Sequence, residues 1–506
     1  MADDDTSILA KQGSISFIGR IFQKGVSFLF LAVATRLVSP STYGVFSLAL
    51  TFVIFLQGFG TLNIHRALGY FVPQFEDASE PEKIRQVLFQ VSLTSLVGTM
   101  LVGTAVVLAA PTLANLFDEP RLVRALPALA IALPLLGLSD ITGSLFKGLK
   151  RVDLDIYTRR ILRPVVKLIT TLILAYIGFR FAALVGGYIV ALVAVLVASA
   201  VFFARTEVSA TGSRAGVSLR EVISYAAPLA FAGVIYTIVW QIDYFVLGYF
   251  GTTADVAIYR VSYQLASNLI IVLGSLNPIY KPLVAGGSNE PTRLESLYRL
   301  TTRWGVLFTL PLAVTLALAP TAYLEVLFTP KYAVAGLTVT VLAAGYFANA
   351  LGGSEGMMLE GLGHTRLSLI NAVVLIIINF ALDVALVPRF GVLGAAIGTA
   401  TALTVRVFAG VFEIRHLYGI TPYTATLAQV LLAGLPALFV GSIVTTLLSN
   451  HLFLIVSVPI GVTVPYAATL YVLSPFTRDD KLVAERIDDR LGRRIVTRAL
   501  PALNQD

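Results

Sequence analysis

The sequence contains no cysteine and few charged residues. The absence of cysteine excludes disulfide bonds, thiol chemistry and Cys-ligated metal sites. Asp, Glu, Lys and Arg make up 13% of the 506 residues, whereas an ordinary soluble domain carries roughly 25%. A chain of this length with so little charge cannot cover a water-facing surface, so a soluble globular protein is excluded.

Catalytic and nucleotide-binding motifs are also absent. The four histidines, His65, His364, His416 and His451, are scattered and make no H-E-x-x-H or other metal-binding spacing. The chain has no G-x-x-x-x-G-K-[ST] phosphate loop, so we do not expect it to hydrolyse ATP itself. The sequence therefore predicts no enzyme, no cofactor and no metal site.

Long apolar segments dominate what is present. Hydrophobic residues make up 57% of the chain, and the mean hydropathy is +0.83. A helix needs about twenty apolar residues to cross a bilayer. We therefore expect an all-α, multi-pass membrane protein with about fourteen spans. They are centred near residues 15–38, 44–64, 86–110, 124–146, 156–178, 182–204, 222–249, 254–280, 303–323, 333–359, 367–388, 391–414, 426–448 and 451–473.

The distribution of Lys and Arg predicts which side of the membrane each loop faces. In a membrane protein, an excess of positive charge (here +8) indicates cytoplasmic loops and lipid headgroups rather than nucleic acid. Placing the N-terminus inside puts most of these residues, including the cluster between Lys147 and Arg163, in the cytoplasm. We expect a cell-membrane protein with both termini cytoplasmic, membrane lipids as partners and no nucleic acid. The acidic Asp3-Asp4-Asp5 argues against a cleaved signal peptide.

Several features of the first half recur about 212 residues later. Leu116–Arg151 and Leu327–His364 share an order of turn, apolar helix, Gly-Leu and polar turn. Pro40–Phe46 likewise occupies the same place as Thr253–Tyr259. Because each half would hold six spans, an even number, both would enter the membrane in the same direction as a parallel repeat.

The duplication predicts two six-helix lobes followed by two extra helices. The expected boundaries are 1–205 for the N-terminal lobe, 206–220 for a cytoplasmic linker, 221–417 for the C-terminal lobe, 418–475 for the extra spans and 476–506 for a cytoplasmic tail. Ala183-x-x-x-Gly187 and Gly394-x-x-x-Gly398 predict close helix packing within each lobe.

Four motifs carry a resemblance to a known family. They are Arg36-Leu37-x-Ser39-Pro40-x-x-Tyr43-Gly44-Val45-Phe46, Asp243–Phe250, Glu360-Gly361-Leu362-Gly363 and Phe390–Ala396. Together with the span count, their order resembles the multidrug/oligosaccharidyl-lipid/polysaccharide (MOP) exporter superfamily, and within it the prokaryotic Wzx-like polysaccharide flippase branch. The resemblance implies a V-shaped, MATE-like transporter with a central cavity that alternates between inward- and outward-facing states. It also implies a substrate class of polyprenyl- or dolichyl-linked glycans, other glycan-assembly proteins as partners, and a monomer.

Cations inside the spans are the candidate substrate-binding residues. Ionisable groups in a membrane are costly, and a lipid-linked sugar carries a phosphate or pyrophosphate that basic side chains bind well. The candidates are Arg20, Lys24, Arg66, Lys147, Lys167, Arg260 and Lys281. The alternative is that these long side chains extend to the headgroups at the cytoplasmic surface.

Acids inside the spans are candidates for ion coupling. They are Asp140, Asp243, Glu355, Glu360 and Asp383, which could carry a proton or Na⁺. They could equally cap helices or pair with the cations. The sequence therefore predicts a flippase that moves a lipid-linked oligosaccharide to the outer leaflet by alternating access. The alternative is a small-molecule or multidrug, cation-coupled antiporter of the same fold.

Overall fold

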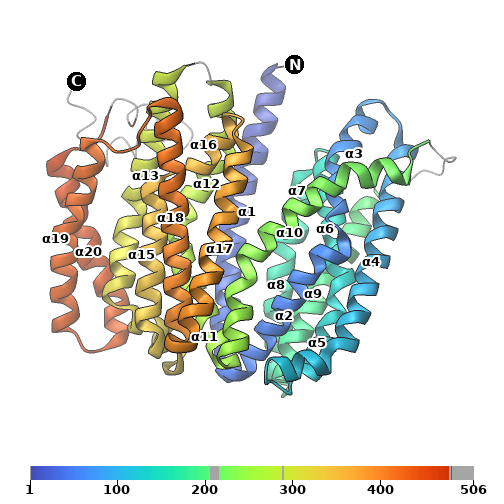
Figure 1. Ribbon diagram of the computed structural model, residues 1–506, viewed down its shortest axis with the longest axis horizontal. Helices are drawn as coiled ribbons and strands as arrows, with labels where there is room; N and C mark the ends of the chain where they lie inside the picture. The colour runs from blue at the N-terminus through green and yellow to red at the C-terminus, as the bar shows by residue number, and fades with distance from the viewer. Residues whose placement is uncertain (1, 206–215, 288–289, 478–479, 481–506) are drawn as a thin grey trace. The chain divides into compact units, whose positions relative to one another are not determined.

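A computed structural model describes residues 2–205, 216–287, 290–477 and 480. In this part of the chain, helices are joined by short turns and no strand is present (Figure 1). Helices suit such apolar segments, because a backbone in lipid must satisfy its polar groups within the segment. The predicted all-α architecture is confirmed.

The first half contains nine α-helices and two irregular turns among the described residues. They are α1 (Ala2–Leu37), α2 (Pro40–Thr61), η1 (Ile64–Ala67), α3 (Leu68–Asp77), α4 (Pro81–Leu116), α5 (Leu122–Ala130), α6 (Ala132–Gly148), α7 (Val152–Asp155), the π-helix η2 (Ile156–Leu162), α8 (Arg163–Tyr176) and α9 (Phe181–Phe203). The second half comprises α10 (Leu219–Phe250), α11 (Thr253–Ser267), η4 (Asn268–Ile270), α12 (Ile271–Gly286), α13 (Pro291–Leu318), α14 (Pro320–Leu327), η5 (Pro330–Ala335), α15 (Gly336–Gly352), α16 (Glu355–Gly361), α17 (Thr365–Phe390), α18 (Val392–Tyr418), α19 (Ala425–Leu447) and α20 (His451–Leu473).

Ten helical segments in the described part are long and apolar enough to cross a membrane. The other four predicted spans fall on α1, η2 with α8, α10, and α11 with α12. Two of these are interrupted helices, since α8 has 14 residues and α12 has 16. A multi-pass membrane protein is thus supported, and the count of fourteen stays a prediction.

The chain divides into two compact units, Met1–Ala257 and Ile258–Asp506. This division falls later than the predicted linker at 206–220, most of which lies outside the described residues. The physical reason is the packing of α10 on α2 within the first unit. Phe245 meets the rings of Phe52 and Phe55 at centroid distances of 4.8 and 5.3 Å. The assignment of lobes to 1–205 and 221–417 remains a prediction.

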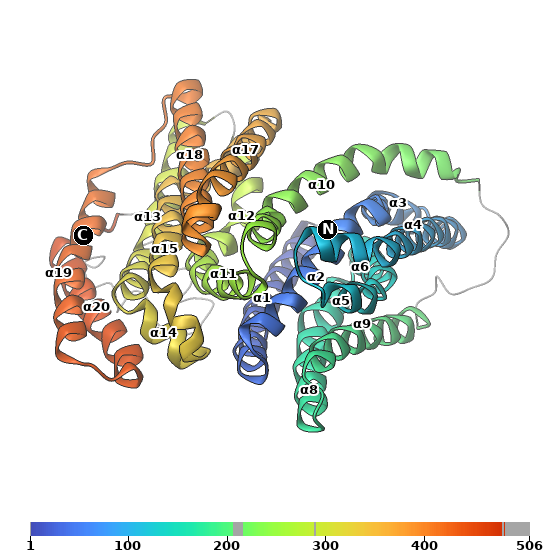
Figure 2. The same cartoon turned by 60° about the horizontal axis from the view of Figure 1, so that its bottom comes forward.

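Small residues bring helices together at corresponding places in both units. A Cβ atom added to Gly187 on α9 would lie 2.0 Å from Thr171 Oγ1 on α8, and one added to Gly398 on α18 would lie 2.3 Å from Asp383 Oδ1 on α17. Helices α8 and α9 run side by side in Figures 1 and 2, and so do α17 and α18. The close packing predicted from the two small-x-x-x-small motifs is present.

The last two helices pack on α13 in the second unit. Val306 and Leu310 of α13 form one buried cluster with Val430 of α19 and Val458 of α20. The chain after α20 is also attached here, because the Trp304 indole donates to Asp480 Oδ1 over 2.6 Å. Residues 481–506 of the predicted tail lie outside the described residues.

Candidate functional site

A network of charged side chains surrounds the π-helix of the first unit. Arg159 Nη2 lies 2.6 Å from Asp140 Oδ1, and Gln57 of α2 donates to Asp140 Oδ2 over 2.6 Å. Arg159 also lies 3.6 Å from Asp155, which Lys147 approaches at 3.4 Å. Asp155 is buried. We call Gln57, Asp140, Lys147, Asp155 and Arg159 the Arg159 cluster.

Local sequence explains why Arg159 faces this network. Pro164 has no N–H and cannot donate to the carbonyl four residues earlier, which disfavours a regular α-helix over Ile156–Leu162. A π-helix widens the turn instead and re-aims its side chains, as such segments often do at functional sites. Gly143 leaves the room required, since a Cβ atom there would meet the Arg159 guanidinium at 2.0 Å.

Two further arginines oppose each other beside the cluster. α1 approaches η2 at Gly19, where a Cβ atom would lie 2.7 Å from Ile156 and 3.7 Å from Arg160. Burial acts most strongly against the charge of Arg160, and the charges of Arg20 and Arg159 also act against it, whereas Asp155 favours it. An anion that binds beside these arginines would favour their charged forms.

His65 lies just past the end of α2 and is within electrostatic range of the same groups. Burial lowers the pKa of His65, Asp140 raises it, and the charges of Arg66, Arg159 and Lys147 lower it further. The net direction is downward, so His65 is neutral at pH 7 and the positive charge of this region comes from lysine and arginine. The candidates Arg20, Lys147 and Asp140 are thus brought together around the π-helix, whereas Arg66 Nη2 lies near α10, 3.4 Å from the position of a Cβ atom at Gly233.

Charges in the second unit are arranged as pairs. Lys281 lies 2.8 Å from Glu360, which also accepts from Ser368 over 3.2 Å. Arg406 lies 2.7 Å from Glu355, whose side chain is buried. The candidate acids Glu360 and Glu355 are thus each balanced by one base.

Asp383 of α17 lies against α18. It is fully buried, and Gly398 and Asn379 lie beside it. The Asn379 amide reaches Thr399 over 3.4 Å, and the Thr399 hydroxyl lies 2.7 Å from that of Tyr259 on α11. A carboxyl group with amide and hydroxyl neighbours is suited to holding a proton or a small cation.

The four remaining candidates lie on α1, α8, α10 and α11. Lys24 is exposed on α1, and the Lys167 ammonium sits 3.6 Å from the centroid of the Phe30 ring. Arg260 is half-buried on α11, and Asp243 is buried on α10. In the described part of the chain, no group of three or more acidic or histidine side chains could hold a metal ion.

Sequence reasoning did not select Arg159, Arg160, Asp155 or Arg406 as site residues. Arg159 and Arg160 lie inside the predicted span 156–178, and Arg406 lies inside the predicted span 391–414, so their charge within a span was an available signal. The pairing of Arg406 with Glu355, about fifty residues earlier on another helix, left no signal in the sequence.

Comparison with known proteins identifies the family. Residues 33–336, more than half of the chain, match the family model described as "Polysaccharide biosynthesis protein". The probable flippase AglR of Haloferax volcanii is 26% identical over 244 residues, covering 47% of this chain and 48% of the relative. The probable low-salt glycan biosynthesis flippase Agl15 of the same organism is 22% identical, covering 37% and 40%. The chain thus matches half or less of the length of these curated relatives.

Solved structures support the fold. The lipid II flippase MurJ in an inward closed conformation aligns with a TM-score of 0.73 at 15% identity, covering 92% of this chain and 98% of that one. An inward-facing MATE-family transporter of the MOP superfamily aligns with a TM-score of 0.64 at 13% identity, covering 78% and 94%. The chain has the fold of these transporters and belongs to the polysaccharide biosynthesis protein family.

Proposed function

We propose that the protein is a flippase that moves a lipid-linked glycan from the cytoplasmic to the outer leaflet. Its family and the names of its curated relatives favour glycan biosynthesis and a transporter rather than an enzyme. The substrate class is a sugar on a polyprenyl or dolichyl phosphate or pyrophosphate. Other glycan-assembly proteins would supply and consume this substrate.

The observation that carries the proposal is the excess of positive charge around the π-helix. Among the side chains that the structure describes there, the cations are Arg20, Lys147, Arg159 and Arg160, and the acids are Asp140 and Asp155. The phosphate or pyrophosphate of a lipid-linked sugar would add negative charge that lysine and arginine side chains bind well. We expect the anionic headgroup to bind there and the sugar to pass through the cavity of an alternating-access cycle.

We further propose that Asp383 couples transport to a cation gradient. Asp383 is fully buried, and Gly398 and Asn379 lie beside it. An ionisable group buried within a span is costly, which makes it a candidate for binding a proton or a cation. Asp383→Asn should abolish the dependence of transport on an imposed Na⁺ or proton gradient, whichever the wild type uses. Unchanged dependence on that gradient in the variant would rule out this role.

A multidrug antiporter of the same fold is the alternative. The similarity to a MATE-family transporter supports the fold only. An exporter of cationic drugs needs an excess of acid in its binding cavity, whereas Asp140 and Asp155 of the Arg159 cluster are already balanced by Arg159 and Lys147. Drug resistance on expression, without any change in surface glycans, would favour this alternative.

The proposed function can be tested with the Arg20→Gln/Arg160→Gln double variant. These substitutions remove the two opposed cations without stranding a buried acid, because Asp155 keeps Lys147 and Arg159. We expect surface glycan to fall at least tenfold and the lipid-linked precursor to accumulate on the cytoplasmic face. Arg124→Gln, an exposed arginine at the start of α5, is the matched control. Normal glycan levels with an expressed and inserted double variant would contradict the proposal.

A further inference from the structure

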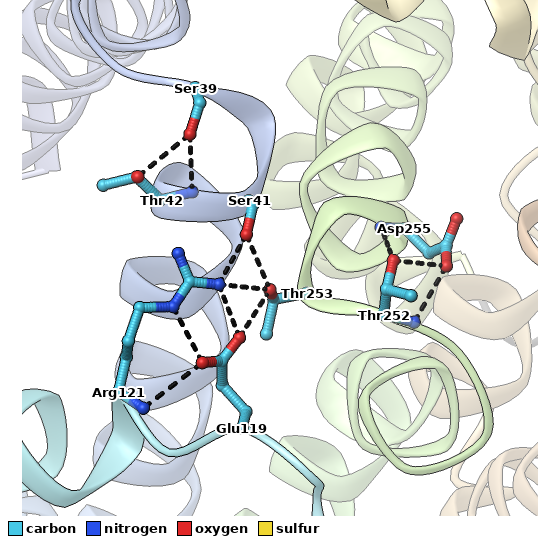
Figure 3. A network of polar contacts seen from close by, with 8 residues as sticks. All are labelled: Ser39, Ser41, Thr42, Glu119, Arg121, Thr252, Thr253 and Asp255. Carbon is cyan, nitrogen blue, oxygen red and sulfur yellow. Dashed lines mark hydrogen bonds and ion pairs between the residues drawn. The ribbon is translucent and has the colours of Figure 1, made fainter.

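The turn between α4 and α5 carries an ion pair that reaches two other helix starts (Figure 3). Arg121 binds Glu119 through two nitrogens, with Nε 2.8 Å from Oε1 and Nη2 2.6 Å from Oε2. Glu119 is buried, with 8% of its surface exposed. All of these residues belong to the first unit.

This ion pair holds the starts of α2 and α11 together. Thr253, the first residue of α11, donates its hydroxyl to Glu119 Oε2 over 2.9 Å. Arg121 Nη2 donates to the hydroxyl of Ser41, near the start of α2, and lies 3.3 Å from that of Thr253. The two hydroxyls are themselves 3.3 Å apart. Four side chains thus form one closed network from three segments of the chain.

Both helix starts that the network joins are capped by side chains. Ser39 caps α2 by accepting from the amide of Thr42 over 3.2 Å. Thr252 and Asp255 cap α11 reciprocally, because each side chain accepts from the backbone amide of the other. Gly44 allows the helices to touch: a Cβ atom there would lie 1.6 Å from the Thr253 carbonyl oxygen.

The duplicated copy lacks the ion pair. Aligning Leu116-Phe117 with Leu327-Phe328 places Pro330 opposite Glu119 and Tyr332 opposite Arg121. The two helix starts that meet, Pro40–Phe46 and Thr253–Tyr259, are themselves corresponding parts of the repeat. The ion pair that joins the starts of α2 and α11 therefore comes from the first copy, Leu116–Arg151, and has no counterpart in the second copy.

The network lies at the opposite end of α2 from the Arg159 cluster. Ser41 and Gln57 are sixteen residues apart on this helix, which at ~1.5 Å per residue separates them by about 24 Å along the axis. Burial opposes ionisation of Glu119, but hydrogen bonds from Arg121 and Thr253 outweigh it and lower the pKa of Glu119. The hydrogen bond with Glu119 raises the pKa of Arg121, so both groups are charged at neutral pH.

We propose that Glu119, Arg121, Ser41 and Thr253 form a lock that holds α2 and α11 together on the extracytoplasmic side. α11 continues past Ala257, the last residue of the first unit, into the second unit. Breaking the contacts of Thr253 would therefore release the start of α11 from α2 close to the boundary between the units. The inference rests on the proposed alternating-access function. The lock is closed while the Arg159 cluster takes up substrate, and it opens for release.

A disulfide across the lock tests whether it must open. The chain has no cysteine, so Ser41→Cys/Thr253→Cys introduces the only thiols. In proteoliposomes containing a short-chain polyprenyl pyrophosphate glycan, we expect oxidation of the double variant to reduce flipping at least tenfold and reduction to restore it. Each single cysteine variant, treated identically, should keep its rate. Full flipping by fully cross-linked protein would overturn the proposal.

A second readout does not depend on any transported substrate. Ala254→Cys, on α11 beside Thr253, reports opening through its reaction with a membrane-impermeant maleimide in intact cells. Adding Glu119→Gln should speed labelling about fivefold or more, whereas adding Asp118→Asn, which removes the neighbouring exposed carboxylate, should not. Equal labelling in both would overturn the lock. Faster labelling of the Glu119→Gln variant, together with no glycan flipping by the wild type, would support the lock and contradict the proposed function.

Discussion

The turns Phe146–Arg151 and Leu359–His364 occupy corresponding places in the two copies of the repeat and share their backbone hydrogen bonding. In each, the last residue donates its amide to the carbonyl five positions earlier over 2.8 Å, as in a Schellman motif. The fifth residue of each has a left-handed backbone, with φ of 56° at Lys150 and 86° at Gly363.

The glycines of these turns also pack alike. A Cβ atom at Gly148 would lie 2.8 Å from Val72 and 3.1 Å from the Leu68 carbonyl oxygen. A Cβ atom at Gly361 would lie at the same two distances from Val284 and from the Lys281 carbonyl oxygen. The backbone and packing of the two copies are therefore the same.

The side chains on this common backbone differ in charge. Lys147 corresponds to Glu360, and Leu68 corresponds to Lys281. The second copy therefore forms its own Lys281–Glu360 pair, whereas Lys147 turns to Asp155 and joins the Arg159 cluster. Close packing constrains the glycines, but exposed or half-exposed charges can diverge without disturbing the fold. The difference makes the first copy the anion-binding one in our account.

The largest effect is expected where the second unit relies on a buried pair. Arg406→Leu leaves the buried Glu355 without its counter-charge, which should cost about 3–5 kcal/mol of stability. Arg159→Leu should cost less, because Asp140 keeps Gln57 and Asp155 keeps Lys147. Thermal unfolding in detergent measures both. Adding Glu355→Gln to Arg406→Leu should restore stability, because it removes the buried charge. Equal losses of stability in Arg406→Leu and Arg159→Leu would contradict the difference between the two units.

Reversing the charge of Lys147 should weaken anion binding next. At about 10 Å and an effective dielectric constant of about 20, a change of two charge units is worth about 3 kcal/mol, or roughly a hundredfold in affinity. Binding of a short-chain polyprenyl phosphate to purified Lys147→Glu measures this loss. Lys150→Glu is the control, because Lys150 is exposed and pairs with Asp77. A similar loss in both variants would argue against a local site.

The two units should contribute unequally to export. Arg66→Ala with Lys281→Ala is expected to lower export about tenfold while the protein stays inserted in the membrane. Arg66→Ala alone should account for most of the loss, since the charge of Lys281 is already balanced by Glu360. Surface-glycan analysis of the single and double variants measures this. A larger loss from Lys281→Ala would reverse the assignment of the site to the first unit.

The smallest effect concerns the shared turn itself. Lys150→Gly removes a side chain from a left-handed position and should raise stability by about 0.5–1 kcal/mol. Gly363→Lys should lower it by about 1 kcal/mol. Thermal unfolding of both variants checks the expectation. Destabilisation by Lys150→Gly would show that the two backbones are not equivalent.

Much of this fold could be predicted from the sequence. Hydropathy and the recurrence of Leu116–Arg151 at Leu327–His364 predicted a helical membrane protein and the corresponding turns, because both depend on local composition. The correspondence of Lys281 with Leu68, instead of with Arg66, could not be predicted. It depends on which residues Gly148 and Gly361 touch.

The candidate site was predicted only in part. Arg20, Lys147 and Asp140 were selected for being charged within spans, and they gather around the π-helix. Arg159 and Arg160 were not selected although they lie in the predicted span 156–178, and the π-helix before Pro164 that aims them is not visible in an apolar pattern. The division of the chain at Ala257 depends on ring contacts between Phe245 and α2, which are equally non-local.

Flipping by purified protein tests the central claim most directly. Wild-type protein in liposomes would receive a polyprenyl pyrophosphate glycan, and its arrival in the opposite leaflet would be followed with an impermeant sugar-oxidising reagent. The account predicts flipping by the wild type and at least a tenfold loss in Arg20→Gln/Arg160→Gln, with Arg124→Gln unchanged. Equal flipping by wild type and the double variant would contradict an anion site at the π-helix of the first unit.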